Sequence, residues 1–143
     1  MSDDNSLAAK LQVMLAKARE DLSLASRIVI DGGPYRVASS RAYYAAFYAM
    51  EAALLSMGIT RSKHGGVISA FNRLFVNTGV FPSHFGALIS GLFRYRNIAD
   101  YEFESRISEA EARSHVQAAS DIVGEIAEYL VREGFIGPED VHD

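Results

Sequence analysis

Apolar residues recur at three- and four-residue spacing in the N-terminal part of the chain, and this spacing constrains the fold more than any other feature. Residues with this spacing share one face of a helix, so the pattern predicts a long amphipathic helix with a single buried stripe. Polar residues between Asp3 and Ser6 offer its N-cap. The stretch Asp31-Gly32-Gly33-Pro34 is expected to end it, because proline lacks an amide donor and clashes with the preceding turn. The stripe consists of Leu7, Leu11, Met14, Leu15, Ala18, Leu22, Ala25 and Val29.

The next segment, from about Tyr35 to Met57, is rich in alanine and aromatic residues and is apolar nearly all round. A helix of this composition belongs in the centre of a bundle, where alanines let neighbouring backbones approach and large rings fill the gaps. Its most apolar stretch, Ala42 to Met57, is interrupted by Glu51 and is shorter than the roughly 20 residues that a membrane span requires. We therefore expect a buried helix that ends at Gly58.

Three further helices are predicted in the rest of the chain. A shorter one covers Lys63 to Val76, and the next begins at Phe81-Pro82-Ser83, where proline is tolerated in the first turn. Ser108 and Glu111 have the spacing of a capping box, which opens a last helix running to about Arg132.

The predicted elements form one all-α domain, because no stretch alternates in the manner of a strand for more than a few residues. Four long helices and one shorter helix with short connections favour an up-and-down antiparallel four-helix bundle with one additional shorter helix. The chain of 143 residues has the usual size of a single domain. We expect the core to span about 6–133 and a polar C-terminal tail to span 134–143.

Cysteine is absent from the sequence, which excludes a disulfide framework and a thiolate zinc site. The N-terminus, Met1-Ser2-Asp3-Asp4-Asn5, is acidic and polar, whereas a signal peptide begins with basic residues and an apolar run. A cytoplasmic location is therefore expected.

No metal or cofactor site is predicted. A di-metal carboxylate site in a bundle needs Glu-x-x-His pairs, and none is present. The nearest spacing joins Glu111 and His115, which lie four apart on a helix that we expect to be acidic and exposed. The glycine-rich phosphate loop and the Gly-x-Ser-x-Gly nucleophile elbow are also missing.

Charge is distributed unevenly along the chain, although the formal net charge is only −4. Between Arg36 and Arg96 the single acidic residue is Glu51, and the segment that follows is strongly acidic. Such asymmetry indicates an anionic ligand if the fold brings the cations together; the alternative is that acidic helices merely flank a basic segment. The seven cations are Arg36, Arg41, Arg61, Lys63, Arg73, Arg94 and Arg96.

Three stretches of the basic segment resemble a known family. Arg96 is followed directly by Asn97 at the end of a predicted helix, which resembles the signature of HEPN domains: arginine, a polar residue, then a histidine after a gap of four to six. The stretches Ser40-Arg41-Ala42-Tyr43-Tyr44-Ala45-Ala46-Phe47-Tyr48 and Lys63-His64-Gly65-Gly66-Val67 are similar to the small stand-alone HEPN proteins of bacteria and archaea. The last match, Arg96-Asn97-Ile98-Ala99-Asp100-Tyr101, completes the three in the expected order.

The resemblance implies a function as well as a fold. It implies binding of RNA or of a nucleotide phosphate, metal-independent RNA cleavage, a homodimer with arginine motifs facing across a cleft, and partnership with a small nucleotidyltransferase in toxin–antitoxin pairs. The chain departs from the signature where the histidine is expected, because Tyr101, Glu102 and Phe103 occupy those positions. Both RNA cleavage and binding without cleavage therefore stay open.

Arg96 and Asn97 are the first catalytic candidates. Two further residues, Asp100 and His64, are candidates to take over the role of the missing histidine. Asp100 lies four residues after Arg96 on the same helix face, where it would orient the guanidinium or accept a proton from a ribose hydroxyl. The alternative is an ordinary surface ion pair. His64 is the second candidate, because an unperturbed imidazole titrates near neutrality. The alternative for His64 is a polar residue at a helix N-terminus.

The remaining candidates would bind phosphate or stack on bases. Arg41 is the proposed second phosphate contact, and the alternative is an arginine whose head extends into solvent. The tyrosines would stack or donate hydrogen bonds at a cleft, although aromatic stripes at helical spacing more often form the core. As an alternative to all of these roles, the basic face would dock an acidic partner protein without catalysis. The other candidates are Arg61, Lys63, Arg94, Tyr44, Tyr48 and Tyr101.

Overall fold

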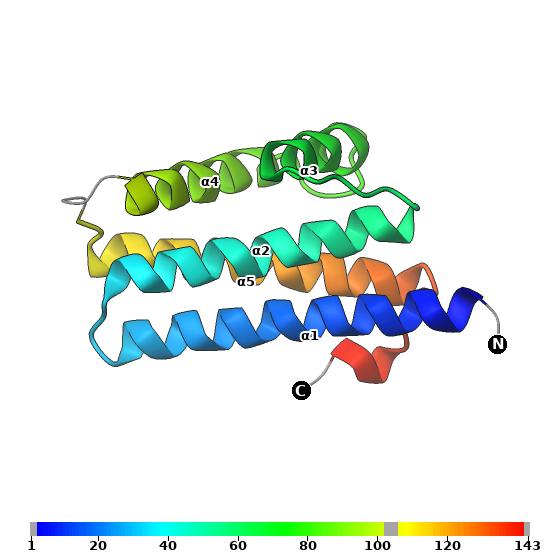
Figure 1. Cartoon of the computed structure of the whole chain (residues 1–143), viewed down its shortest axis with the longest axis horizontal. Coiled ribbons are helices and arrows are strands. Elements are labelled where there is room, and N and C mark those ends of the chain that lie inside the picture. The colour runs from blue at the N-terminus through cyan, green and yellow to red at the C-terminus, as the bar shows by residue number, and fades with distance from the viewer. Residues whose placement is uncertain (1–2, 102–105, 142–143) are drawn as a thin grey trace.

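A computed structural model describes the backbone of residues 3–101 and 106–141, and the side chains of residues 7–94 and 106–140. Four long helices run alternately in opposite directions, and a shorter helix lies beside the fourth (Figure 1). No strand occurs in these ranges, so the predicted all-α antiparallel bundle is confirmed. The helices are α1 (Asp3–Ile30), α2 (Tyr35–Ser56), α3 (His64–Phe71), α4 (Phe85–Tyr101) and α5 (Glu109–Arg132).

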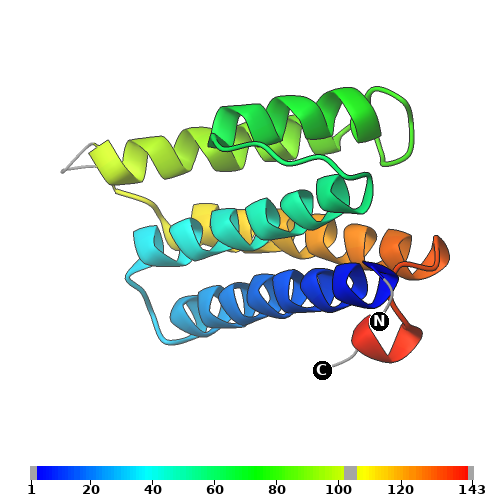
Figure 2. The same ribbon diagram turned by 45° about the vertical axis from the view of Figure 1, so that its right-hand side comes forward.

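Helix α2 is the centre of the bundle, because it contacts α1, α3, α4 and α5. Figure 2 shows α3 and α4 above α2 and α1 below it, while α5 lies beside α2 and contacts both α2 and α1. Its alanines are almost fully buried, which lets the neighbouring backbones approach closely. They are Ala38, Ala42, Ala45, Ala46, Ala49, Ala52 and Ala53.

Helix α1 ends at Ile30, as the glycine and proline residues predict. Gly32 and Gly33 have φ angles of 93° and 110°, in the left-handed region that glycine adopts without steric cost. The amide of Gly33 donates to the carbonyl of Ile28 at 2.9 Å, which satisfies one carbonyl of the last turn. Pro34 then stands at the N-cap of α2.

The predicted helix from Lys63 to Val76 is continuous, but it changes from an α-helix to a π-helix at Asn72. Its second part is a π-helical segment, η1 (Asn72–Val76), closed by a 2.8 Å bond from the Asn77 amide to the Asn72 carbonyl. Segments of this kind occur as short insertions in helices.

Helix α4 begins at Phe85, so the helix start predicted at Phe81-Pro82-Ser83 is wrong. Phe81 is buried, and its ring lies 5.6 Å from the ring of Phe71. Its amide donates to the Phe75 carbonyl at 2.9 Å. These contacts hold Phe81 in a connecting turn, so the chain enters α4 later than the proline suggests.

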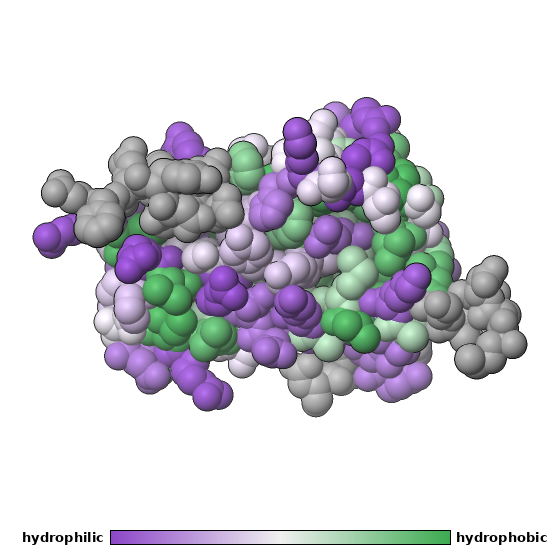
Figure 3. All heavy atoms as spheres, viewed as in Figure 1, coloured by the Kyte–Doolittle hydropathy of each residue, from purple (hydrophilic) through white to green (hydrophobic). Residues whose placement is uncertain are grey.

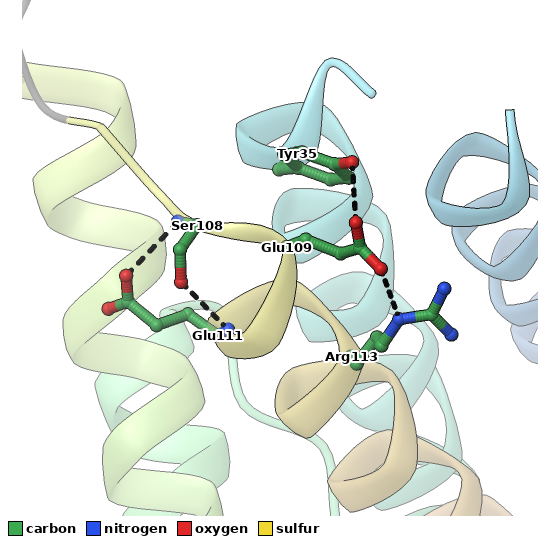
Figure 4. A network of polar contacts seen from close by, with 5 residues as sticks. All are labelled: Tyr35, Ser108, Glu109, Glu111 and Arg113. Carbon is green, nitrogen blue, oxygen red and sulfur yellow. Dashed lines mark hydrogen bonds and ion pairs between the residues drawn. The ribbon is translucent and has the colours of Figure 1, made fainter. Parts of the chain in front are cut away.

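The capping box at the start of α5 is confirmed. The Ser108 hydroxyl accepts from the Glu111 amide, and the Glu111 carboxylate accepts from the Ser108 amide, both at 3.1 Å (Figure 4). In the same view, the Glu109 carboxylate accepts from the Tyr35 hydroxyl at 3.1 Å and from Arg113 Nε at 2.8 Å. The first turn of α5 is therefore capped and tied to the first turn of α2.

The segment after α5 folds back on the bundle. Ile136 is 6% exposed and belongs to the core, and a short 3-10 helix, η2 (Pro138–Val141), follows it. Gln12 donates to the Asp140 carboxylate at 3.0 Å, and Arg19 donates to the Asp140 carbonyl at 2.6 Å. The expected polar tail thus contains an apolar anchor and polar contacts to α1.

The surface seen in Figure 3 mixes hydrophilic residues with separate apolar areas over α1 and α2. Among the described residues, no helix combines the length and the apolar character needed to cross a membrane.

Candidate functional site

His64 is the first residue of α3 and is partly buried against α2. Its ring stacks on Phe47, with centroids 4.2 Å apart and planes inclined by 25°. Its Nδ1 atom lies 2.8 Å from the Tyr43 hydroxyl, within hydrogen-bond distance. His64 is therefore more than a polar residue at a helix start: two side chains of α2 define the position of its ring.

Tyr43 joins His64 to α4. The tyrosine is 1% exposed, and its ring lies 6.1 Å from that of Phe93. In the sequence, Tyr43 lies in a segment that is apolar nearly all round, and nothing there predicts a polar role for it. The hydrogen-bonded pair Tyr43 and His64 is 21 positions apart and joins two helices, so no local residue spacing predicts it.

Arg41 lies closer to the start of α2, and the structure gives it partners that the sequence does not reveal. Its guanidinium is 3.3 Å from the Asp21 carboxylate of α1 and 5.1 Å above the Tyr44 ring. The Arg41 side chain is 35% exposed, so it is neither buried nor fully extended into solvent. Tyr44 in turn meets the His64 ring edge-on at 6.0 Å. Arg41, Tyr44 and His64 therefore form one continuous group of contacts.

Three further candidate cations belong to α4 or to the segment that leads into α3. Lys63 is the N-cap residue of α3, next to His64, and is exposed. Arg61 is exposed, donates to the Thr60 carbonyl at 2.8 Å, and lies against the first turn of α3 beside Gly66. Arg94 is exposed and follows Phe93 on α4. Lys63 and Arg94 thus directly adjoin His64 and Phe93 in the chain, and Arg61 lies three residues before His64.

The signature residues Arg96, Asn97, Asp100 and Tyr101 lie in the last turns of α4. The helical backbone extends to Tyr101, so Arg96 and Asp100 are one turn apart, as predicted. The side chains of these four residues lie outside the described part of the structure. Their roles stay predictions.

Tyr48 is also a candidate for stacking at the cleft. Its ring lies 4.7 Å from the Lys17 ammonium of α1, a cation–π contact, and 6.0 Å from the Tyr44 ring. Glu51, one turn further along α2, is half-buried, and burial raises the pKa of its carboxyl while Lys17 acts to lower it. Tyr48 therefore packs against α1, at the interface between α1 and α2.

His115 contradicts its sequence prediction, because it is buried and not exposed. It is 8% exposed, and its Nδ1 lies 2.7 Å from the Ser39 hydroxyl of α2. Burial lowers the pKa of His115, and the Glu111 carboxylate acts in the opposite direction. The buried face of α5 includes His115 because Ala112 and Ala119 lie at three- and four-residue spacing from it. Within the described residues, no group of three or more His, Asp or Glu side chains is arranged to hold a metal ion.

Comparisons with known proteins agree with this architecture. The family model of the HEPN domain matches residues 11–130. A protein of Methanocaldococcus jannaschii named "Putative toxin MJ0605" is 36% identical over 121 residues, which cover 85% of this chain and 89% of that protein. A "UPF0332 protein" of Thermotoga maritima is 32% identical over 114 residues, covering 80% of this chain and 86% of that protein.

A solved structure is similar in fold. The crystal structure of TT1696 from Thermus thermophilus matches with a TM-score of 0.71 and 19% identity, over 83% of this chain and 97% of that one. At this identity the likeness concerns the fold alone. The family model spans the described parts of the candidate site, and the two sequence relatives cover most of the chain. On this basis the chain belongs to the HEPN domain family.

Proposed function

We propose that this protein binds RNA or a nucleotide phosphate at the junction of α2, α3 and α4, through Arg96, Arg41, Lys63 and His64. One observation carries the proposal. Tyr43 is hydrogen-bonded to His64 of α3 and packs against Phe93 of α4, so both neighbouring helices meet on one side chain of α2.

Helix geometry connects this junction with the family signature. Arg96, Asn97 and Asp100 follow Phe93 by three, four and seven positions, a spacing that places all four on one face of a regular helix. Phe93 contacts Tyr43 from this face. The signature residues would then continue along α4 from the point where Tyr43 and His64 meet.

These residue types suit a phosphodiester. An arginine guanidinium binds phosphate with two parallel hydrogen bonds, and a lysine adds a point charge. For cleavage, the ribose 2′-oxygen would attack phosphorus while Asp100 accepts its proton. The bond from phosphorus to the 5′-oxygen would break as that oxygen takes a proton from the imidazolium form of His64, which becomes neutral, with the Asn97 amide donating to a non-bridging oxygen. No metal ion takes part in these steps.

The names of relatives suggest the cellular role. Two relatives from Methanocaldococcus jannaschii carry the name "Putative toxin". We accordingly extend the proposal to a toxin-like ribonuclease of a toxin–antitoxin pair, acting in the cytoplasm as a homodimer with a nucleotidyltransferase as its partner. The absence of cysteine agrees with a reducing compartment.

The test is cleavage of a labelled single-stranded RNA pool by the purified protein in the presence of EDTA. Arg96→Ala should lower the rate roughly tenfold to hundredfold, the cost of losing hydrogen bonds to a charged group. His64→Ala should lower it by about a hundredfold, as expected for a general acid.

The matched control is Arg73→Ala, which removes an exposed arginine of η1 that is not part of the candidate site. It should leave the cleavage rate unchanged. Equal activity of wild type, Arg96→Ala and His64→Ala would contradict the assigned roles. If none of the proteins cleaves RNA but the wild type binds it, the phosphate site stands without catalysis; if none binds RNA, the basic face should be tested as a docking surface for an acidic protein.

A further inference from the structure

We infer that Tyr43 is the positioning residue of His64: its hydroxyl donates to Nδ1, so that the neutral imidazole carries its proton on Nε2. This inference deepens the proposed function and rests on it for its consequence, because it specifies the chemical form in which His64 would meet a phosphate. The tautomer itself is a property of the protein without RNA and can be tested separately.

The distance and the burial of the two groups support a specific bond. The Tyr43 hydroxyl and His64 Nδ1 are 2.8 Å apart, and Tyr43 is 1% exposed. A polar group buried to this degree costs free energy unless it is hydrogen-bonded. The bond between Tyr43 and His64 therefore meets a requirement of the fold as well as fixing the ring.

The chemistry of the pair favours the phenol as the donor. The O–H group of tyrosine ionises near pH 10 and is a much stronger acid than the N–H group of a neutral imidazole, while the unprotonated imidazole nitrogen is a good acceptor. The O–H of Tyr43 would thus point to Nδ1 of His64. Because a neutral imidazole has one proton, that proton then resides on Nε2.

The rings around His64 hold its plane without the hydroxyl. Phe47 stacks on it at 4.2 Å, and Tyr44 meets it edge-on at 6.0 Å. Tyr43 also packs against Phe47 at 5.8 Å and Phe93 at 6.1 Å through its ring alone. Replacing Tyr43 by phenylalanine should therefore keep the packing and remove the hydrogen bond that selects the tautomer.

The selected tautomer matters for the proposed site. A neutral histidine that carries its proton on Nε2 can donate a hydrogen bond to a non-bridging phosphate oxygen, whereas proton transfer to a leaving 5′-oxygen needs the imidazolium form. A histidine that exchanges between tautomers offers this donor only part of the time. Tyr43 would in this way set the strength of binding, although it touches no substrate atom.

The first experiment is long-range proton–nitrogen NMR of the full chain labelled with 15N-histidine, at a pH where His64 is neutral. The wild type should show His64 with its proton on Nε2. Tyr43→Phe should show a mixture of tautomers, and the control Tyr129→Phe, which removes a phenol hydroxyl on α5 away from the site, should keep the wild-type pattern. A wild-type proton on Nδ1, or an unchanged pattern in Tyr43→Phe, would overturn the inference, and the wild-type spectrum alone decides it if the variant fails to fold.

A second experiment separates this inference from the proposed function. A single-stranded RNA with 2′-O-methyl riboses cannot be cleaved through the 2′-oxygen, so its affinity reports binding only. Tyr43→Phe should weaken binding about fivefold, the effect of one hydrogen bond, whereas the control Tyr129→Phe should bind as the wild type does. The expected tautomer with no RNA binding by the wild type would refute the proposed function and leave the role of Tyr43 intact; RNA binding with the other tautomer would refute the role of Tyr43 alone.

Discussion

The buried pair of Ser39 and His115 gives a prediction whose size follows from the structure. The Ser39 hydroxyl lies 2.7 Å from His115 Nδ1, and the two residues are 2% and 8% exposed. Ser39→Ala removes one partner and leaves a buried ring nitrogen without this bond. An unsatisfied buried polar atom costs about 1–3 kcal/mol, so the free energy of unfolding should fall by this amount.

Thermal unfolding followed by circular dichroism measures this loss. For a domain of this size, a loss of about 1–3 kcal/mol corresponds to a fall in Tm of about 3–12 °C. Ser90→Ala is a matched control, because Ser90 lies on α4 and is exposed. It should change Tm little. A Ser39→Ala variant as stable as Ser90→Ala would refute the importance of the pair.

The same pair predicts how stability depends on pH. Burial lowers the pKa of His115 in the folded protein, with Glu111 opposing the change. Above about pH 6.5, the usual pKa of histidine, the imidazole is neutral in both the folded and the unfolded protein. Its titration then leaves the free energy of unfolding unchanged. As the pH falls below this value, the unfolded chain binds a proton that the folded protein resists, so stability decreases towards the lowered pKa.

Urea unfolding at a series of pH values tests this sign. His115→Gln should flatten the decrease in the free energy of unfolding below about pH 6.5, where one proton limits the slope to about 1.4 kcal/mol per pH unit. His84→Gln is the control, because His84 is exposed. If the free energy of unfolding of wild type and His115→Gln depended on pH in the same way, the lowered pKa of His115 would not be the cause of the decrease.

Two further substitutions test the cap of α5 and the ion pair of Arg41. Ser108→Ala removes the acceptor of the Glu111 amide and should cost about 1 kcal/mol, measured by urea unfolding; an unchanged midpoint would show that the cap is dispensable. Asp21→Asn removes the charge that pairs with Arg41. If Arg41 binds phosphate, RNA affinity in filter binding should then rise slightly, because that arginine gains freedom; a lower affinity would place the ion pair among the determinants of the site.

The fold was predictable from the sequence because local signals agree with the tertiary structure. The stripe of α1, the glycines after Ile30 and the capping box at Ser108 each act within a few residues of chain. The start of α4 was not predictable in this way, because burial of the Phe81 ring overrides the preference of Pro82 for a first helical turn.

The site was predictable only in part, for a related reason. Lys63 and His64 were recognisable as a motif, whereas the bond from Tyr43 to His64 and the ion pair from Arg41 to Asp21 join different helices. Such contacts depend on how the helices are rotated against one another, which the apolar periodicity defines only approximately. His115 shows the same limit, because a polar residue on a charged helix faces the core when its neighbours at helical spacing are buried.

The most direct test of the central claim is the salt dependence of RNA binding by wild type and Arg96→Ala, with Arg73→Ala as control. Contacts with phosphate make the logarithm of the affinity fall linearly with the logarithm of the salt concentration, in proportion to the number of phosphates neutralised. Arg96→Ala should bind more weakly and lower the slope by about one, while Arg73→Ala behaves as the wild type. Equal affinity and slope in wild type and Arg96→Ala would contradict a phosphate site at the end of α4.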